Sequence, residues 1–317
     1  MSERLEVATF GELLVVIAPF HLRAPLEAAA LLEKSVGGAE VNVALGLARL
    51  GHKVTWVGAV GDDPFGHEGV RVLRGEGIDV SRVVVSPSAS TGIYFKELTA
   101  LDGLRNYPYR EASAASRMTY ADLDVDHLLS GRVLHLTGIT ALVSDAGHDL
   151  VARLIAEARA RGIHVSFDVN LRHRLLRDRD AVTLLAPLAR AADTLFLSRS
   201  EAALLFSATD PAEVQALFPT LQVQTVVVHH AQGAFAVTPS EVAKVDARAI
   251  DVVDPTGAGD AFVAGYLSGW LEHLPLTARL KRAEHCAAHA VVNRGDSPLG
   301  VSRPATSSTV TTESDDR

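Results

Sequence analysis

The stretch Asp254-Pro255-Thr256-Gly257-Ala258-Gly259-Asp260 leads directly into the apolar run Ala261–Leu267. A loop with two glycines therefore opens a helix, and glycine allows both a sharp turn and the close approach of an anion to the backbone amides. The start of a helix adds unpaired N–H donors and the positive end of the helix dipole. The sequence therefore predicts a phosphate site at this turn.

Asp260 is the informative residue of this turn. A carboxylate in the first helical turn would lie beside the bound phosphate, where it could take a proton from an incoming hydroxyl. The alternative is a plain acidic residue at a helix start, with the glycines forming a tight turn. Short motifs have a high false-positive rate, so other segments of the chain are needed to distinguish a catalytic Asp260 from a plain acidic residue at a helix start.

Around this motif, short β-rich apolar runs alternate with longer helical segments. The order predicts an α/β layered fold, in which a central, mostly parallel sheet lies between helices. The predicted strands are Val54–Val60, Val133–Leu136, His164–Phe167, Thr194–Leu197 and Thr225–Val228. The predicted helices are Val41–Leu50, Ala146–Arg161 and Arg199–Phe206, the last of them capped by Ser198.

Two stretches interrupt this alternation. Ser90–Arg117 contains two alternating segments, Gly92–Leu98 and Arg105–Arg110, around Asp102-Gly103, which is a hairpin signal. With Leu13–Val36 it predicts a small sheet that covers the main one as a lid. We expect residues 1–12, 37–89 and 118–303 to form the core, 13–36 and 90–117 the β-lid, and the polar segment 304–317 a disordered tail.

The composition is that of a globular protein, with 48% hydrophobic and 21% charged residues in a chain of 317. A net charge of −8, without a dense Lys/Arg patch, argues against a nucleic-acid partner. A single cysteine, Cys286, argues against a disulfide framework and fits a reducing compartment. The N-terminus does not look like a signal peptide, and the apolar stretches are only strand-length. We therefore expect a cytoplasmic protein without membrane spans.

Two further segments accompany the first motif: Gly37-Gly38-Ala39-Glu40-Val41-Asn42 and Gly58–Gly66. Together with Asp254–Asp260 they resemble both signatures of the ribokinase-like (PfkB) carbohydrate kinases, in order and spacing, from about residue 5 to about residue 305. The resemblance implies a ribokinase-like three-layer α/β/α sandwich with a β-lid, ATP and Mg²⁺ as cofactors, and a homodimer or higher oligomer formed through the lid. It also implies that Asp260 is the general base and that the amides of Gly257, Ala258 and Gly259 hold the charge developing on the phosphoryl group.

Within that family the chain is most similar to the 2-keto-3-deoxygluconate kinases. The similarity implies phosphorylation of the terminal (C6) hydroxyl of this sugar acid, and arginine forks match a carboxylate bidentately. Pro108 stands where these kinases usually have a second aromatic residue, so either Tyr107 or Tyr109 fills that role. The matching segments are Gly37–Asn42, Thr91–Tyr94, Tyr109-Arg110 with Ser113–Ser116, Leu134–Ile139 and Asp168–Arg172. The implied sugar-site residues are Gly37, Gly38, Asn42, Tyr94, Tyr109, Arg110 and Arg172.

The nucleotide side departs further from the family pattern. Ser198-Arg199-Ser200-Glu201 resembles an Asn-x-x-Glu segment with serine in the first place, and Glu201 would hold Mg²⁺ through water. The family's Lys-x-Gly-x-x-Gly loop reads His229–Ala234 here, without the lysine and the first glycine. The implied nucleotide-site residues are Ser198, Glu201, His229, Gln232, Gly233 and Glu284, and Asp254 and Thr256 could form a site for K⁺.

Three alternatives remain open from the sequence. Another small-sugar kinase, such as a fructokinase or ribokinase, would share the same motifs. The altered loop His229–Ala234 would also fit a sugar-binding regulator that has lost catalysis. Finally, His285 and His289 share one helix face next to Cys286, which suits either ordinary packing or a metal site.

Overall fold

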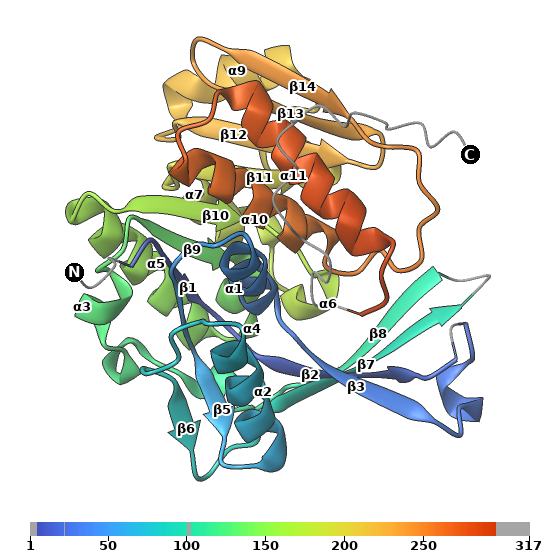
Figure 1. The fold of residues 1–317 in the computed structure, drawn as a ribbon. Helices are drawn as coiled ribbons and strands as arrows, with labels where there is room; N and C mark the ends of the chain where they lie inside the picture. Colours follow the sequence, from blue (N-terminus) through green and yellow to red (C-terminus); the bar gives the residue numbers. More distant parts are fainter. Residues whose placement is uncertain (1–4, 22, 100–102, 296–317) are drawn as a thin grey trace, which may run out of the picture.

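A sheet of eight strands forms the centre of the protein in a computed structural model that describes residues 5–21, 23–99 and 103–295 (Figure 1). Its neighbouring strands are parallel except at β12–β13 and β13–β14, which are antiparallel. The predicted mostly parallel sheet is thus confirmed. In spatial order the strands are β14 (Val242–Asp246), β13 (Gly233–Val237), β12 (Thr225–His230), β11 (Thr194–Ser198), β10 (His164–Asp168), β9 (Val133–Thr137), β1 (Val7–Phe10) and β4 (Val54–Val57).

Helices cover both faces of this sheet, as the three-layer prediction requires (Figure 1). One apolar cluster joins one face of the sheet to α1, α10 and α11, and another joins the opposite face to α5, α7 and α8. The helices are α1 (Ala39–Arg49), α2 (Pro64–Gly75), α3 (Val125–Leu128), α4 (Gly138–Val143), α5 (Asp145–Ala160), α6 (His173–Leu176), α7 (Ala181–Arg190), α8 (Arg199–Phe206), α9 (Pro211–Leu217), α10 (Ala258–Leu271) and α11 (Leu276–Val291).

One predicted strand is wrong in its extent. Val54–Val60 is not continuous, because the chain leaves the main sheet after β4 and continues as β5 (Ala59–Gly61). β5 pairs with β6 (Val84–Ser86) in a separate two-stranded sheet. All seven residues of Val54–Val60 are buried. A continuous buried run is typical of a single strand, so the sequence pattern could not reveal that the chain changes its pairing partner.

A second sheet of four strands projects from the core (Figure 1). Its spatial order is β3 (Leu32–Gly37), β2 (Leu14–Pro19), β7 (Gly92–Thr99) and β8 (Gly103–Tyr109). The β7–β8 hairpin and the small separate sheet are as predicted, although residues 100–102 of the turn lie outside the described residues. The boundaries 13–36 and 90–117 of the lid stay predictions, and the predicted tail 304–317 lies outside the described residues.

Among the residues that the structure describes, no helix combines the length and the apolar character needed to cross a membrane.

Candidate active site

A cavity of about 360 Å³ lies between the four-stranded sheet and the carboxyl ends of the central strands. Its wall combines β7 and β8 with the segments that follow β1, β9 and β10 and with the start of α10. Ligands of doubly wound folds bind at such an edge, where the chain leaves neighbouring strands in opposite directions. The predicted site residues in the wall are Gly38, Asn42, Tyr94, Arg110, Arg172, Thr256, Gly257 and Asp260.

Asp260 stands in the first turn of α10 and is 8% exposed. Asn42 donates a hydrogen bond to its Oδ2 at 2.7 Å, and Asn170 donates one to its Oδ1 at 3.4 Å. Burial raises the pKa of Asp260, while the Asn42 hydrogen bond and the positive charge of Arg172 act in the opposite direction. A carboxylate with a raised pKa is a better proton acceptor, so the environment of Asp260 suits a general base.

The turn before α10 stands between two cavities. Gly257 and Asp260 line the first cavity, whereas Ala258 and Gly259 line a second one of about 510 Å³. Gly257 is the N-cap of α10 and has φ of 75°, a left-handed conformation that favours glycine. A group transferred between ligands in the two cavities would therefore pass the amides at the start of α10, which attract anions.

The two predicted arginines differ in their pairing. Arg110 donates from Nη1 to Oε2 of Glu12 at 3.1 Å, and both side chains are largely buried. Among the described residues, no side chain forms a hydrogen bond or ion pair with the guanidinium of Arg172, whose charge nevertheless lowers the pKa of Asp260. Arg172 is therefore one cation of this wall that is available to a ligand, whereas the charge of Arg110 is compensated by Glu12.

Two buried polar atoms in the wall also lack partners within residues 5–21, 23–99 and 103–295. They are Oδ1 of Asn42 and Nε of Arg110. A buried polar group without a hydrogen bond is costly and uncommon, and a bound ligand is one way to satisfy it. Oδ1 of Asn42 is an acceptor and Nε of Arg110 is a donor. A sugar hydroxyl can both donate and accept a hydrogen bond, so hydroxyl groups could satisfy both atoms.

Only some of the predicted glycines and tyrosines line the cavity. Gly38 lines the wall with φ of 123°, and a Cβ there would lie 2.1 Å from the carbonyl oxygen of Glu12, so only glycine fits. Gly37 ends β3 and lies outside the wall. Tyr94 is in the wall, but Tyr109 is 68% exposed and packs its ring against Phe95 instead.

The other candidate for the second aromatic position also points elsewhere. The hydroxyl of Tyr107 donates to Oε2 of Glu97 at 3.1 Å. Between the two tyrosines, Pro108 itself lines the cavity. The structure therefore brings Tyr94 to the site but neither Tyr107 nor Tyr109.

Two buried glutamates at this site were not predicted from the sequence. Glu40 accepts hydrogen bonds from the hydroxyls of Thr137 and Thr140, each at 2.7 Å, and burial raises its pKa to about 7. Glu12 is 4% exposed, and burial raises its pKa despite the charge of Arg110. Glu40 belongs to the quoted di-glycine segment, and its place directly after Gly38-Ala39 was the available signal. Glu12 has no comparable signal in the sequence.

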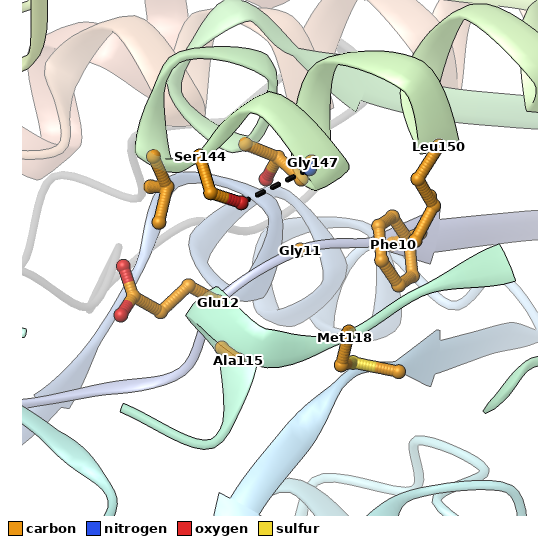
Figure 2. A pocket seen from close by; sticks show the side chains of 10 residues that line it. Phe10, Gly11, Glu12, Ala115, Met118, Ser144, Gly147 and Leu150 are labelled. Carbon is orange, nitrogen blue, oxygen red and sulfur yellow. Dashed lines mark hydrogen bonds between the residues drawn. The ribbon is translucent and has the colours of Figure 1, made fainter. Parts of the chain in front are cut away.

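A smaller hollow adjoins Glu12 on the other side. Figure 2 shows it between Phe10, Met118 and Leu150, with Ser144 Oγ accepting a hydrogen bond from the amide of Gly147 at 3.0 Å. Its volume of about 20 Å³ admits a water molecule but no sugar. Of the two spaces that Glu12 lines, the cavity of about 360 Å³ is therefore the one large enough for a carbohydrate.

The second cavity is lined by both apolar and polar residues. Five of its apolar lining residues suit contact with a flat base; they are Ile250, Val252, Ala287, Ala288 and Val291. The predicted residues His229, Gly233 and Glu284 also line it. Glu284 accepts hydrogen bonds from the backbone N and from Nε of Arg248, both at 3.1 Å.

The histidine pair takes two different roles in this wall. Burial lowers the pKa of His229, whose ring centroid lies 5.7 Å from that of Phe262. Nδ1 of His230 accepts a hydrogen bond from the backbone N of Gln232 at 3.2 Å. Gln232 itself was predicted to bind nucleotide, but it is not among the residues that line the cavity.

Ser198 and Glu201 form a reciprocal cap at the start of α8. Ser198 Oγ accepts from the amide of Glu201 at 3.2 Å, and Glu201 Oε2 accepts from the amide of Ser198 at 2.6 Å. Oε1 of Glu201 accepts from the amide of Leu171 at 2.6 Å. The cap predicted at Ser198 is thus confirmed, and neither residue lines the two cavities. The negative charge of Glu201, after burial, raises the pKa of Asp168.

Asp254 and Thr256 are in direct contact. Oδ1 of Asp254 accepts from the hydroxyl of Thr256 at 2.6 Å and from its amide at 3.0 Å. Oδ2 of Asp254 accepts from Nζ of Lys96, a residue of β7, at 2.7 Å. Lys96 was not among the residues predicted for this site.

The rings of His285 and His289 lie 4.4 Å apart on α11. Within the described ranges of the chain, no group of three or more His, Cys, Asp or Glu side chains is placed to hold a metal ion.

Residues 4–300 match the pfkB family of carbohydrate kinases. The chain belongs to this family. It is thus a sugar kinase, as predicted.

Several relatives are similar over most of their length. The chain is 37% identical to a 2-dehydro-3-deoxygluconokinase of Thermoproteus tenax over 77% of each chain. It is 32% identical to the 2-dehydro-3-deoxygluconokinase of Bacillus subtilis, over 92% of this chain and 91% of that one. Fructokinase-1 of Oryza sativa is also 32% identical, over 94% and 95%. Both predicted substrate classes therefore occur among similar proteins.

Solved structures agree with this assignment. A PfkB protein from Polaromonas superposes with a TM-score of 0.82 at 35% identity, over 90% of this kinase and 96% of that chain. A putative ribokinase II from E. coli, solved in complex with ATP and Mg²⁺, gives a TM-score of 0.84 at 27% identity, over 92% and 94%. The ribokinase-like fold is therefore confirmed.

Proposed function

We propose that this kinase transfers the γ-phosphoryl group of ATP to the C6 hydroxyl of 2-keto-3-deoxygluconate, also named 2-dehydro-3-deoxygluconate. The observation that carries the proposal is the position of Arg172. Its guanidinium has no partner among the described side chains, and it lines the same cavity as Asp260. A substrate with a carboxylate would pair with this cation bidentately and place its far hydroxyl toward Asp260.

Asp260 acts as the general base in this proposal. Its Oδ2 is held by Asn42, and the carboxylate takes the proton of the sugar hydroxyl as the oxygen attacks the phosphoryl group. The amides of Gly257, Ala258 and Gly259 hold the charge that develops on the phosphoryl oxygens. The position of this turn between the two cavities supports that role.

ATP would occupy the second cavity, with the base against its apolar lining residues and its phosphates toward Ala258 and Gly259. Mg²⁺ usually keeps several waters and is bound through substrate phosphates and one or two carboxylates, where it neutralises phosphate charge. Asp168 and Glu201 fit this role. Burial and then the negative charges of Glu201 and Asp260 raise the pKa of Asp168, and a nearby cation would offset these charges. Glu201 still has lone pairs free for a bound water, although two amides already donate to it.

A fructokinase is the second candidate, and the Arg110–Glu12 pair favours it. Because Glu12 compensates the charge of Arg110, only part of the positive charge in the wall remains for a carboxylate. A neutral ketose could then bind through hydroxyl groups to Asn42 Oδ1 and Arg110 Nε.

The two candidates differ in the charge of the substrate. The test is kcat/KM in a coupled ADP assay with 2-keto-3-deoxygluconate, fructose and ribose at the same ionic strength. We expect the sugar acid to give the highest kcat/KM. A higher value for fructose would overturn the proposed substrate and leave the kinase assignment intact.

We also propose that the protein forms a homodimer through the lid. Large apolar side chains are exposed on the four-stranded sheet and its loops: Phe20 (52%), Leu31 (61%), Leu32 (49%) and Tyr109 (68%). Phe20, Leu31 and Leu32 are neighbours across β2 and β3, and adjacent exposed apolar side chains suit an interaction surface. Light scattering should give the mass of a dimer, and Leu32→Asp should shift it toward the monomer. A monomeric wild type would contradict the proposal.

A further inference from the structure

A buried lysine of the lid reaches the turn that precedes α10. Lys96 is 5% exposed, and its Nζ donates to Oδ2 of Asp254, which is 2% exposed, at 2.7 Å. Tyr94 and Lys96 are two residues apart on β7, so both side chains are on the same face of this strand. The ion pair therefore joins the lid strand of the sugar cavity to the anion-binding turn.

Four hydrogen-bond donors occupy the two carboxylate oxygens of Asp254. Its Oδ1 accepts from the amide and the hydroxyl of Thr256, and its Oδ2 accepts from Lys96 Nζ and from the amide of Gly295 at 3.3 Å. Each oxygen thus takes two donors, which uses the lone pairs of a carboxylate. A K⁺ ion at this carboxylate would need at least one of those lone pairs as a ligand. The side chain of Asp254, which was expected to hold K⁺, therefore does not fit an ion there.

We propose that the ammonium group of Lys96 takes the place of a monovalent cation at Asp254, so that this kinase orders its anion-binding turn without K⁺. The lysine carries the same single positive charge and is tethered to β7. It acts through a chain of contacts, in which Lys96 holds Asp254, Asp254 holds Thr256, and Thr256 precedes the amides of Gly257–Gly259. Lys96 is thus a positioning residue.

The charge state of the pair agrees with this role. Burial alone would raise the pKa of Asp254, but the hydrogen bonds from Lys96 and Thr256 and the charge of Lys96 outweigh it and lower the pKa. Asp254 is therefore ionised and paired. Removing one partner of a buried ion pair leaves an uncompensated charge. After loss of the lysine, Asp254 would then attract a small cation from solution.

The first experiment compares rates in K⁺ and in choline at equal ionic strength. It uses whichever sugar the wild type phosphorylates, so it does not depend on the identity of the substrate. Wild type should show the same kcat in both salts. Lys96→Ala should lose about tenfold or more of kcat in choline, because the turn is misplaced, and K⁺ or NH₄⁺ should restore most of it. Lys34→Ala, which removes an exposed lysine of the lid paired with Glu68, should show no salt-specific change.

The second experiment is thermal melting without any substrate. A cation that binds only the folded state raises the Tm by mass action. K⁺ should therefore raise the Tm of Lys96→Ala relative to choline and leave that of wild type unchanged. If the alanine variant does not fold, Lys96→Met keeps the apolar stem and serves in its place. Strong activation of wild type by K⁺ would overturn the inference, as would a Lys96 variant that K⁺ neither rescues nor stabilises.

Discussion

The side-chain amide of Asn42 donates a hydrogen bond of 2.7 Å to Oδ2 of Asp260, across 218 positions of the chain. Both residues are buried, at 3% and 8% exposed. Asn42 comes from the di-glycine segment at the start of α1, and Asp260 comes from the turn at the start of α10. The two sequence signatures therefore meet in a single contact, and this contact orients the proposed base.

Asp260→Asn should lower kcat by about 10²–10⁴ and leave the Kd of the sugar nearly unchanged, because the variant keeps the shape of the side chain but cannot accept the proton. Steady-state kinetics and calorimetry with the sugar would measure both values. Asp126→Asn, which changes a side chain that is 89% exposed, is the matched control. A kcat above about a tenth of wild type would remove Asp260 from the proton transfer.

Asn42→Leu should move the acid limb of the kcat/KM profile to higher pH. The hydrogen bond from Asn42 lowers the pKa of Asp260, so its loss leaves the effect of burial less opposed. The pKa then rises further, and a higher pH is needed to form the carboxylate. A profile that falls in height without moving along the pH axis would show that Asn42 has only a structural role.

Arg172→Ala should weaken a sugar acid much more than a neutral sugar. A charge-assisted contact is worth about 1.5–3 kcal/mol, which corresponds to roughly ten- to hundredfold in KM for uniform binding. Arg71→Ala on the exposed side of α2 is the control for loss of an arginine. Equal losses for 2-keto-3-deoxygluconate and for a neutral ketose would mean that Arg172 does not contact a carboxylate.

Glu40→Gln should reduce the loss of stability between pH about 5 and about 8. The pKa of Glu40 is about 7 in the folded protein against an ordinary value of 4.5, so the folded state holds a proton that the unfolded state releases. The resulting stabilisation is present at low pH and is lost as the pH rises through about 7; the shift corresponds to about 3 kcal/mol.

Burial also raises the pKa values of Glu12, Asp168 and Asp260, and these groups change stability in the same direction. Only the difference between wild type and Glu40→Gln therefore reports on Glu40. Urea unfolding at several pH values measures it. Parallel stability curves for the two proteins would contradict a proton held on Glu40 at neutral pH.

The sequence predicted those features that depend on local patterns. Apolar runs gave the parallel strands, and the two glycines before an apolar helix gave the turn that holds Asp260. Contacts between residues that are far apart in the sequence were not predicted. Lys96 lies in an ordinary alternating strand, and nothing near it in the sequence points to Asp254, 158 positions away. Tyr109 was predicted to line the sugar site but does not. Its position in a motif identifies the residue, but it does not show on which face of β8 the side chain lies.

His229→Gln should leave the affinity for ATP nearly unchanged at every pH. Burial lowers the pKa of His229, so the ring is neutral near pH 7 and offers no positive charge to a phosphate. Calorimetry from pH about 5.5 to about 8 on wild type and on His229→Gln tests this, with His230→Gln as the comparison within the same strand. ATP itself titrates in this range, so only the difference between the proteins is informative. Tighter binding by wild type than by His229→Gln, growing as the pH falls, would show that a charged His229 contacts the phosphates; superimposable curves would leave it as part of the apolar wall beside Phe262.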